Sequence, residues 1–231
     1  MSAISAFLTP SAAYLLTDGG QFSEADDGTR GQLHRVRSKV HLMPEINAAI
    51  SVVGTLAAAE GIRAVLAHGL RMHTDFDDLL EDFGNVARNV DALIKQHAPN
   101  AAATATMFRV VLIGWSVERD APIAAVVENY PGMEAGRVRH PFGVTEVETL
   151  VSPPIPSLID FTDDNAEVEA LRIIELQRGS GVEAFMTGAG HAKGDFLIGG
   201  FAQLTRVARD GISLRVLRRW PDIIGEKVNP S

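Results

Sequence analysis

The sequence predicts an α+β fold in which helices cover β-sheets. Three changes along the chain lead to this prediction. Short apolar runs and alternating patterns dominate the first 54 residues and indicate paired strands. Apolar residues recur at helical spacing between residues 56 and 96, and strand-like runs return after residue 106. This order of strand pairs, a helix pair, strands, a helix and strands favours a layered arrangement over a regular βαβ alternation.

Two hairpins are predicted in the first part of the chain. Each consists of two apolar runs separated by turn-forming residues, Thr9-Pro10-Ser11 in the first hairpin and Pro44 in the second. The four predicted strands are residues 2–8, 12–17, 37–43 and 46–53. The Gly- and Asp-rich residues 21–34 between the hairpins predict a surface loop.

Two helices are predicted after the second hairpin. The first begins at Leu56 and the second covers residues 75–96, with Thr74 or Asp75 as its N-cap. The second helix has one continuous apolar face, made of Phe76, Leu79, Leu80, Phe83, Val86, Val90 and Ile94. Ala87 and Leu93 widen this face beyond a narrow stripe, which predicts a contribution to self-association as well as to the core.

The second half of the chain predicts further strands and one helix. The predicted elements are strands at 107–117 and 122–130, a helix at 165–177 and a hairpin of residues 196–208 and 211–219. Asp210-Gly211 is a strong turn signal for that hairpin. The helix has Val168, Leu171, Ile174 and Leu176 as its apolar candidates. The Pro-rich residues at about 131–164 predict a long irregular excursion within a single domain that spans residues 1–231.

The composition narrows the classes of function. The chain has 231 residues, of which 46% are hydrophobic, and this suffices for one large core. The net charge of −8 disfavours binding to nucleic-acid phosphates. The absence of cysteine excludes disulfides, thiolate metal ligands and a thiol nucleophile, and it fits a reducing compartment. The sequence contains neither a long uncharged apolar run nor a basic N-terminal region followed by an apolar stretch. We therefore expect no membrane span, no secretory signal and a cytoplasmic location.

Neither a metal site nor a cofactor site is expected. His68 and His73 are five residues apart, whereas two metal ligands on one helix prefer a spacing of four. The Gly-rich residues 188–194 lack the Gly-Lys-Ser/Thr ending of a phosphate-binding loop.

Ser2 is the candidate nucleophile. If Met1 is removed, residue 2 carries both a hydroxyl and a free α-amine. An α-amine, with an ordinary pKa of about 7.7, can act as general base for its own side chain. Asp18 and Lys39 are the two charged residues that such a site requires nearby.

These residues, in this order, resemble the proteasome β-subunit and HslV peptidase family of N-terminal nucleophile (Ntn) hydrolases. That family has a nucleophile at the mature N-terminus, an Asp and a small residue after an apolar strand, a Lys that opens a strand, and a Gly at the end of the next strand. The matching positions are Ser2, Asp18-Gly19, Lys39-Val40 and Gly54. Near the C-terminus the family has an Asp that precedes Gly-Gly, a strand and an Asp-Gly turn, and the matching positions are Asp195, Gly199-Gly200 and Asp210-Gly211.

The resemblance implies a four-layer αββα sandwich of the Ntn-hydrolase type. It also implies an amidohydrolase or peptidase that transfers an acyl group from a peptide or amide substrate to Ser2. In this scheme Asp18 orients Lys39, the Lys39 ammonium keeps the terminal amine neutral, the Gly54 N–H binds the oxyanion, and Asp195 belongs to the proton network. Relatives of this kind assemble into rings, so a homo-oligomer is expected.

Two other functional interpretations remain open. Ile198 stands where the family has a Ser that assists the terminal amine, and no clear Ser-Gly-Ser-like element precedes the last helix. These departures favour a catalytically inert proteasome-like subunit with a structural or assembly role. The other alternative is an unrelated α+β binding domain.

Overall fold

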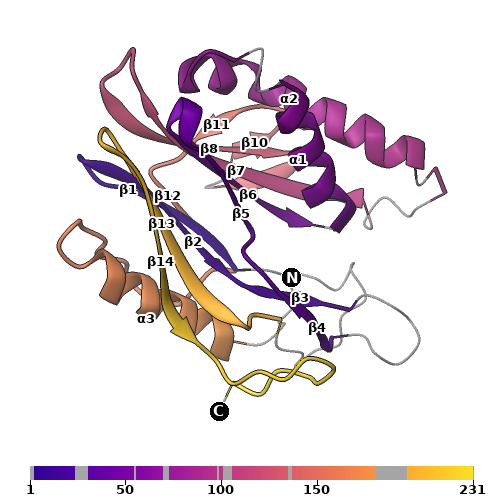
Figure 1. Ribbon diagram of the computed structural model, residues 1–231, viewed down its shortest axis with the longest axis vertical. Helices are drawn as coiled ribbons and strands as arrows, with labels where there is room; N and C mark the ends of the chain where they lie inside the picture. The colour runs from indigo at the N-terminus through magenta and orange to yellow at the C-terminus, as the bar shows by residue number, and fades with distance from the viewer. Residues whose placement is uncertain are drawn as a thin grey trace.

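The computed structural model describes residues 3–23, 31–54, 56–69, 73–97, 99–100, 106–134, 137–180 and 197–230. Within these residues, two five-stranded antiparallel sheets pack against each other (Figure 1). Sheet 1 has the order β12 (Thr149–Ser152), β1 (Ile4–Leu8), β2 (Ala12–Asp18), β13 (Phe201–Ala208) and β14 (Gly211–Arg219). Sheet 2 has the order β11 (Thr145–Glu146), β8 (Ala121–Glu128), β7 (Phe108–Ser116), β6 (Ala48–Gly54) and β5 (Val40–Met43).

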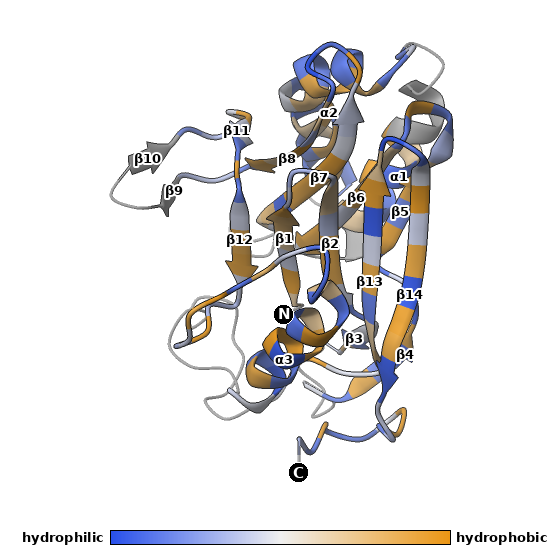
Figure 2. Ribbon diagram, turned by 90° about the vertical axis from the view of Figure 1, so that its left-hand side faces the viewer, coloured by the Kyte–Doolittle hydropathy of each residue, from blue (hydrophilic) through white to orange (hydrophobic). Residues whose placement is uncertain are grey.

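Helices lie on the outer faces of both sheets. The pair α1 (Leu56–Gly69) and α2 (Phe76–His97) covers sheet 2, and α3 (Ala166–Gly179) covers sheet 1 on the opposite side of the molecule (Figure 1). One cluster of buried side chains lies between the helix pair and sheet 2, a second between the sheets, and a third under α3. The central strands β7 and β8 are mostly hydrophobic, as strands covered on both faces are expected to be (Figure 2).

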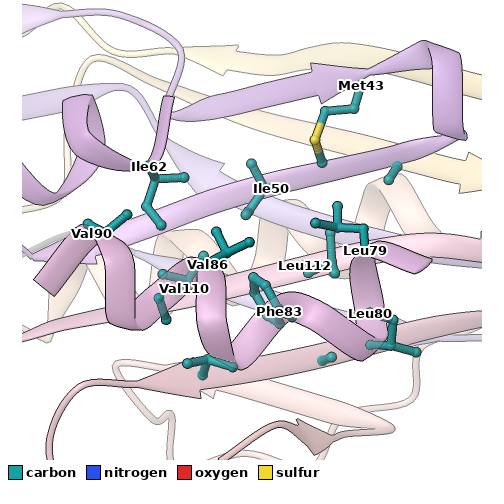
Figure 3. Close-up of a cluster of buried hydrophobic side chains, with 14 of the residues drawn as sticks. Met43, Ile50, Ile62, Leu79, Leu80, Phe83, Val86, Val90, Val110 and Leu112 are labelled. Carbon is teal, nitrogen blue, oxygen red and sulfur yellow. The ribbon is translucent and has the colours of Figure 1, made fainter. Parts of the chain in front are cut away.

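The amphipathic face of α2 is confirmed. All seven predicted apolar residues are buried, and Figure 3 shows several of them against Ile50, Val110 and Leu112 of sheet 2. Gly114 of β7 permits this contact, because a Cβ atom there would overlap the ring of Phe76. The Asp75 carboxylate accepts the N–H of Asp78 at 3.0 Å and so caps the helix.

The expected role of this face in self-association has to be corrected. Val86, Ala87, Val90 and Ile94 are buried within the chain, and of the nine apolar residues named on this helix only Leu93 is exposed, at 37%. The widened face is explained by contacts within one chain, because α2 packs against both α1 and the strands of sheet 2.

Both predicted N-terminal hairpins are present, one in each sheet. Leu8 pairs with Ala13 in the first hairpin, around the predicted turn. In the second, a short 3₁₀ helix, η1 (Pro44–Ile46), connects β5 and β6. The two hairpins face each other through side chains of the inter-sheet cluster, including Leu15 and Ala49.

The segment at 131–164 is more ordered than predicted. It contains β9 (Gly132–Glu134) paired with β10 (Arg137–Arg139), then β11 at the edge of sheet 2 and β12 at the edge of sheet 1. The segment therefore runs from one sheet to the other. Strands of two to four residues between prolines are too short to show a period in the sequence.

Two further predictions need correction. The loop at 21–34 begins and ends in a small hairpin, because β3 (Gly20–Phe22) pairs with β4 (Leu33–Val36). On α3, Val168 is 75% exposed and Leu176 is 38% exposed. Ile174 is buried as predicted, and the buried face otherwise consists of Ala166, Ala170, Ile173, Gln177 and Arg178. Small Ala side chains and two polar residues on that face weaken the apolar contrast from which the face was predicted.

No helix among the described residues is long and apolar enough to cross a membrane.

Candidate active site

Asp18, the last residue of β2, is fully buried and accepts four hydrogen bonds. Its Oδ1 atom accepts the Ala3 N–H at 3.0 Å and the Lys39 ammonium at 2.6 Å. Its Oδ2 atom accepts the N–H groups of Gly20 and Gly199, at 3.0 Å and 3.1 Å. These donors come from four separate segments, so the carboxylate fixes the positions of all of them relative to one another.

Lys39 lies immediately before β5, and its side chain is only 8% exposed. Burial lowers the pKa of Lys39, whereas the charge and hydrogen bond of Asp18 oppose this change. The Ser51 hydroxyl donates to the Lys39 carbonyl at 3.1 Å and holds the backbone against β6. The result is a buried cation–carboxylate pair that connects the two sheets.

Close backbone contacts surround the pair, and glycines make them possible. Gly19 donates to the Phe201 carbonyl at 2.9 Å, and a Cβ atom on Gly19 would lie 2.5 Å from the Phe201 ring. Gly200 has a φ of +76°, and a Cβ atom there would lie 2.8 Å from Val36. Gly19 and the Gly199-Gly200 pair, which were both matched to the family, therefore lie at the end of sheet 1, next to Asp18.

Two predicted site residues, Ser2 and Asp195, lie outside the described residues. The Ala3 nitrogen that donates to Asp18 belongs to the peptide bond with residue 2.

Gly54 ends β6 opposite Phe108 and is exposed at the protein surface. Its φ is +149°, and a Cβ atom would lie 2.8 Å from both the Met107 carbonyl oxygen and Phe108 Cβ. The position therefore requires glycine for both backbone and steric reasons. Helix α1 begins two residues later, so Gly54 lies at a junction of strand and helix.

An ion pair that the sequence does not predict lies close to Lys39, between Arg37 and Glu60. Arg37 lies two residues before Lys39 in the chain, and its Nη2 atom is 2.7 Å from Glu60 Oε1 of α1. The Arg37 hydrogen bond is the main cause that lowers the pKa of Glu60, and Arg63 lies 3.5 Å from the same oxygen. No local pattern in the sequence indicates Glu60 as the partner of Arg37.

Ile198, at the position of the family's assisting Ser, is 3% exposed and belongs to the apolar cluster under α3. It supplies no hydroxyl. Within the described ranges, no group of three or more His, Asp or Glu side chains is arranged to hold a metal ion.

No protein-family model matches the sequence, and no curated protein matches it. Among solved structures, the chain is similar to Anbu (ancestral beta-subunit) from Yersinia bercovieri. The TM-score is 0.63 at 10% sequence identity, over 96% of this chain and 89% of that chain. At this identity the likeness concerns the fold, and it does not single out the HslV peptidases. The chain therefore has a mixed α/β fold of the proteasome-like type.

Proposed function

We propose that the chain is an Ntn-type amidohydrolase or peptidase that uses Ser2 as its nucleophile after removal of Met1. One observation carries this proposal: the buried Asp18–Lys39 pair is hydrogen-bonded to the Ala3 N–H, which is the peptide nitrogen that follows residue 2. In the proposed site the Lys39 ammonium would favour a negatively charged oxygen on Ser2, because an opposite charge nearby stabilises the ionised form.

The proposed reaction begins with attack of the Ser2 oxygen on an amide carbonyl carbon. The hydroxyl proton passes to the α-amine, and the resulting oxyanion accepts a hydrogen bond from the Gly54 N–H. The protonated amine then gives its proton to the leaving nitrogen as the C–N bond breaks. Water, deprotonated by the same amine, hydrolyses the acyl ester and regenerates Ser2. Asp18 keeps Lys39 charged and oriented, and Asp195 is proposed to belong to the proton network.

We assign the layers to the four-layer αββα sandwich of Ntn hydrolases, with helices on both outer faces of the stacked sheets. We also propose a homo-oligomer and a peptide or amide substrate. The likeness to a β-subunit supports these two points.

A second candidate function is an inert subunit of the same fold. Ile198 favours it, because an apolar side chain buried under α3 replaces the hydroxyl that would assist the terminal amine. The two functions differ in whether Ser2 reacts.

A β-lactone probe tests the proposal. The N-terminus of the full chain is first determined by intact mass, and the protein is then incubated with the probe. We expect a mass addition on Ser2 that disappears in Ser2→Ala and Lys39→Ala and persists in Ser11→Ala, which changes an exposed turn residue. Retention of Met1, or a wild-type protein that does not react, leaves the inert subunit as the function.

A further inference from the structure

A buried ion pair lies beside the Gly199–Gly200 turn that binds Asp18. Arg178 of α3 and Asp222 of the C-terminal segment are each 4% exposed at the side chain. Two hydrogen bonds join them, Nη1 to Oδ2 at 2.9 Å and Nη2 to Oδ1 at 2.6 Å. A two-point contact of this kind fixes the relative orientation of two planar groups. The guanidinium also lies 4.6 Å from the centre of the Trp220 ring.

The pair holds the turn at the residues on both sides of Gly199. Arg178 Nη1 donates to the Ile198 carbonyl at 2.7 Å, and Asp222 Oδ2 accepts the Gly200 N–H at 2.8 Å. The N–H of Gly199, between these two contacts, donates to Asp18. A displacement of the ion pair would therefore move the amide that binds the Asp18 carboxylate.

Packing leaves little freedom for the turn to move independently of the pair. A Cβ atom on Gly199 would lie 2.8 Å from Asp222 Oδ2 and 3.1 Å from Val228. The C-terminal segment is itself held against β4, because Leu33 donates to Glu226 and accepts from Gly225, both at 2.8 Å. Contacts thus continue from β4 through the C-terminal segment and Arg178 to Asp18.

We propose that Arg178 and Asp222 are positioning residues, which hold the Gly199–Gly200 turn so that its amide keeps Asp18 directed at Lys39. The inference rests on the proposed function, in which the orientation of Lys39 matters for the reaction. A misplacement of about 1 Å in such an arrangement can lower the rate about 100-fold. The C-terminal residues 220–229 then support the site through the Gly199–Gly200 turn, and they have no proposed contact with substrate.

The test compares variants in their reaction with a β-lactone probe. The rate constant of acylation at saturating probe and the probe concentration at half-saturation are measured on the full chain with Met1 removed. We expect Asp222→Asn to lower the rate constant at least about tenfold and to change the half-saturation concentration less than about twofold. Arg178→Lys keeps the charge but loses the two-point contact, so a smaller decrease of about threefold or more is expected.

Asp163→Asn is the matched control. Asp163 lies next to α3 and accepts hydrogen bonds from Tyr14 and Thr9, at the opposite end of β2 from Asp18. The control makes the same Asp→Asn change at an exposed residue just before the same helix, whose hydrogen bonds are to Tyr14 and Thr9 rather than to the Gly199–Gly200 turn. We expect its acylation rate constant to stay within about twofold of the wild type.

The outcomes separate this inference from the proposed function. An unchanged rate constant in folded Asp222→Asn, or an equal decrease in Asp163→Asn, overturns the positioning role. If Asp222→Asn does not fold, Arg178→Lys takes its place, and an unchanged rate constant in that variant overturns the positioning role. A wild-type protein that does not react overturns the proposed function instead, and hydrogen exchange of the Gly199 amide then tests the positioning contact. We expect Asp222→Asn to lower the protection of the Gly199 amide about tenfold, and Arg178→Lys takes its place if Asp222→Asn does not fold. Asp163→Asn should leave this protection unchanged. Equal protection in all variants overturns the inference.

Discussion

Lys39 Nζ lies 2.6 Å from Asp18 Oδ1 in a pair whose side chains are 8% and 0% exposed, although the residues are 21 positions apart. An ion pair removed from water to this degree differs from one at the surface, because neither charge can be rehydrated when its partner is lost. Loss of either charge should therefore destabilise the fold, and in this sense the pair contributes to stability independently of any catalytic role.

Removal of one partner tests this contribution. We expect Asp18→Ala to lower the free energy of unfolding by about 3–5 kcal/mol, because it leaves the Lys39 ammonium and three backbone N–H groups without their acceptor. Urea unfolding measures the change. Arg119→Met is the control, since its ion pair with Glu146 is 53% and 49% exposed and a solvent-exposed pair of this kind contributes little to stability. Equal effects of the two substitutions would contradict the prediction.

Two glycine-to-alanine substitutions, at Gly54 and at Gly179, test the steric constraint at Gly54. Gly54→Ala should lower the free energy of unfolding by about 1–3 kcal/mol, because its φ of +149° and two contacts at 2.8 Å exclude a Cβ atom. Gly179→Ala adds the same methyl group at the end of α3, where no atom lies within 4 Å. It should be neutral or stabilise by up to about 1 kcal/mol. Thermal unfolding compares the two, and a neutral Gly54→Ala would show that the end of β6 relaxes freely.

The raised pKa of Tyr14 predicts that the stability of the fold decreases at alkaline pH. Burial, followed by the hydrogen bond to Asp163, raises its pKa from 10.0 to about 12. The folded protein therefore keeps the phenol proton longer than the unfolded chain does. The corresponding stability is fully present below about pH 10 and is lost as the pH rises towards 12. Two pKa units correspond to about 2.7 kcal/mol, and with solvent screening we expect a loss of about 1–2 kcal/mol.

The measurement for Tyr14 compares urea unfolding of the wild type and Tyr14→Phe between pH 9 and about pH 11.5. The wild type should lose more stability over this range than the variant. Asp163→Asn should lower the pKa of Tyr14 towards 10, because the Asp163 carboxylate is among the causes that raise it. A difference titration of phenolate absorbance reports this pKa directly. Parallel stability curves for the wild type and Tyr14→Phe would refute the assignment.

Self-association is a separate prediction. We expect light scattering at micromolar concentration to give a mass above the monomer mass of 24.8 kDa, in line with the likeness to a β-subunit. Exposed apolar residues in the described part of the chain, such as Val168 on α3 and Leu214 on β14, offer surface for such contacts. A monomer mass over the whole concentration range would count against the proposed homo-oligomer.

Much of the local structure could be predicted from the sequence alone. The hairpin around Thr9-Pro10-Ser11 and the apolar face of α2 depend on turn chemistry and on periodicity, which neighbouring residues determine. Asp18 and Lys39 could be named as candidates because Asp18 follows one apolar strand and Lys39 opens another, and the structure brings their side chains together. Their roles in a reaction with Ser2 stay a prediction.

Other features were decided only by the tertiary structure. The position of β12 beside β1, the inward face of α3 and the Arg178–Asp222 pair all join residues far apart in the chain. Arg178 and Asp222 are separated by 44 positions, and neither has a local pattern that distinguishes it from a surface charge. Burial makes their contact strong, and burial is a property of the packed layers rather than of any short segment of sequence.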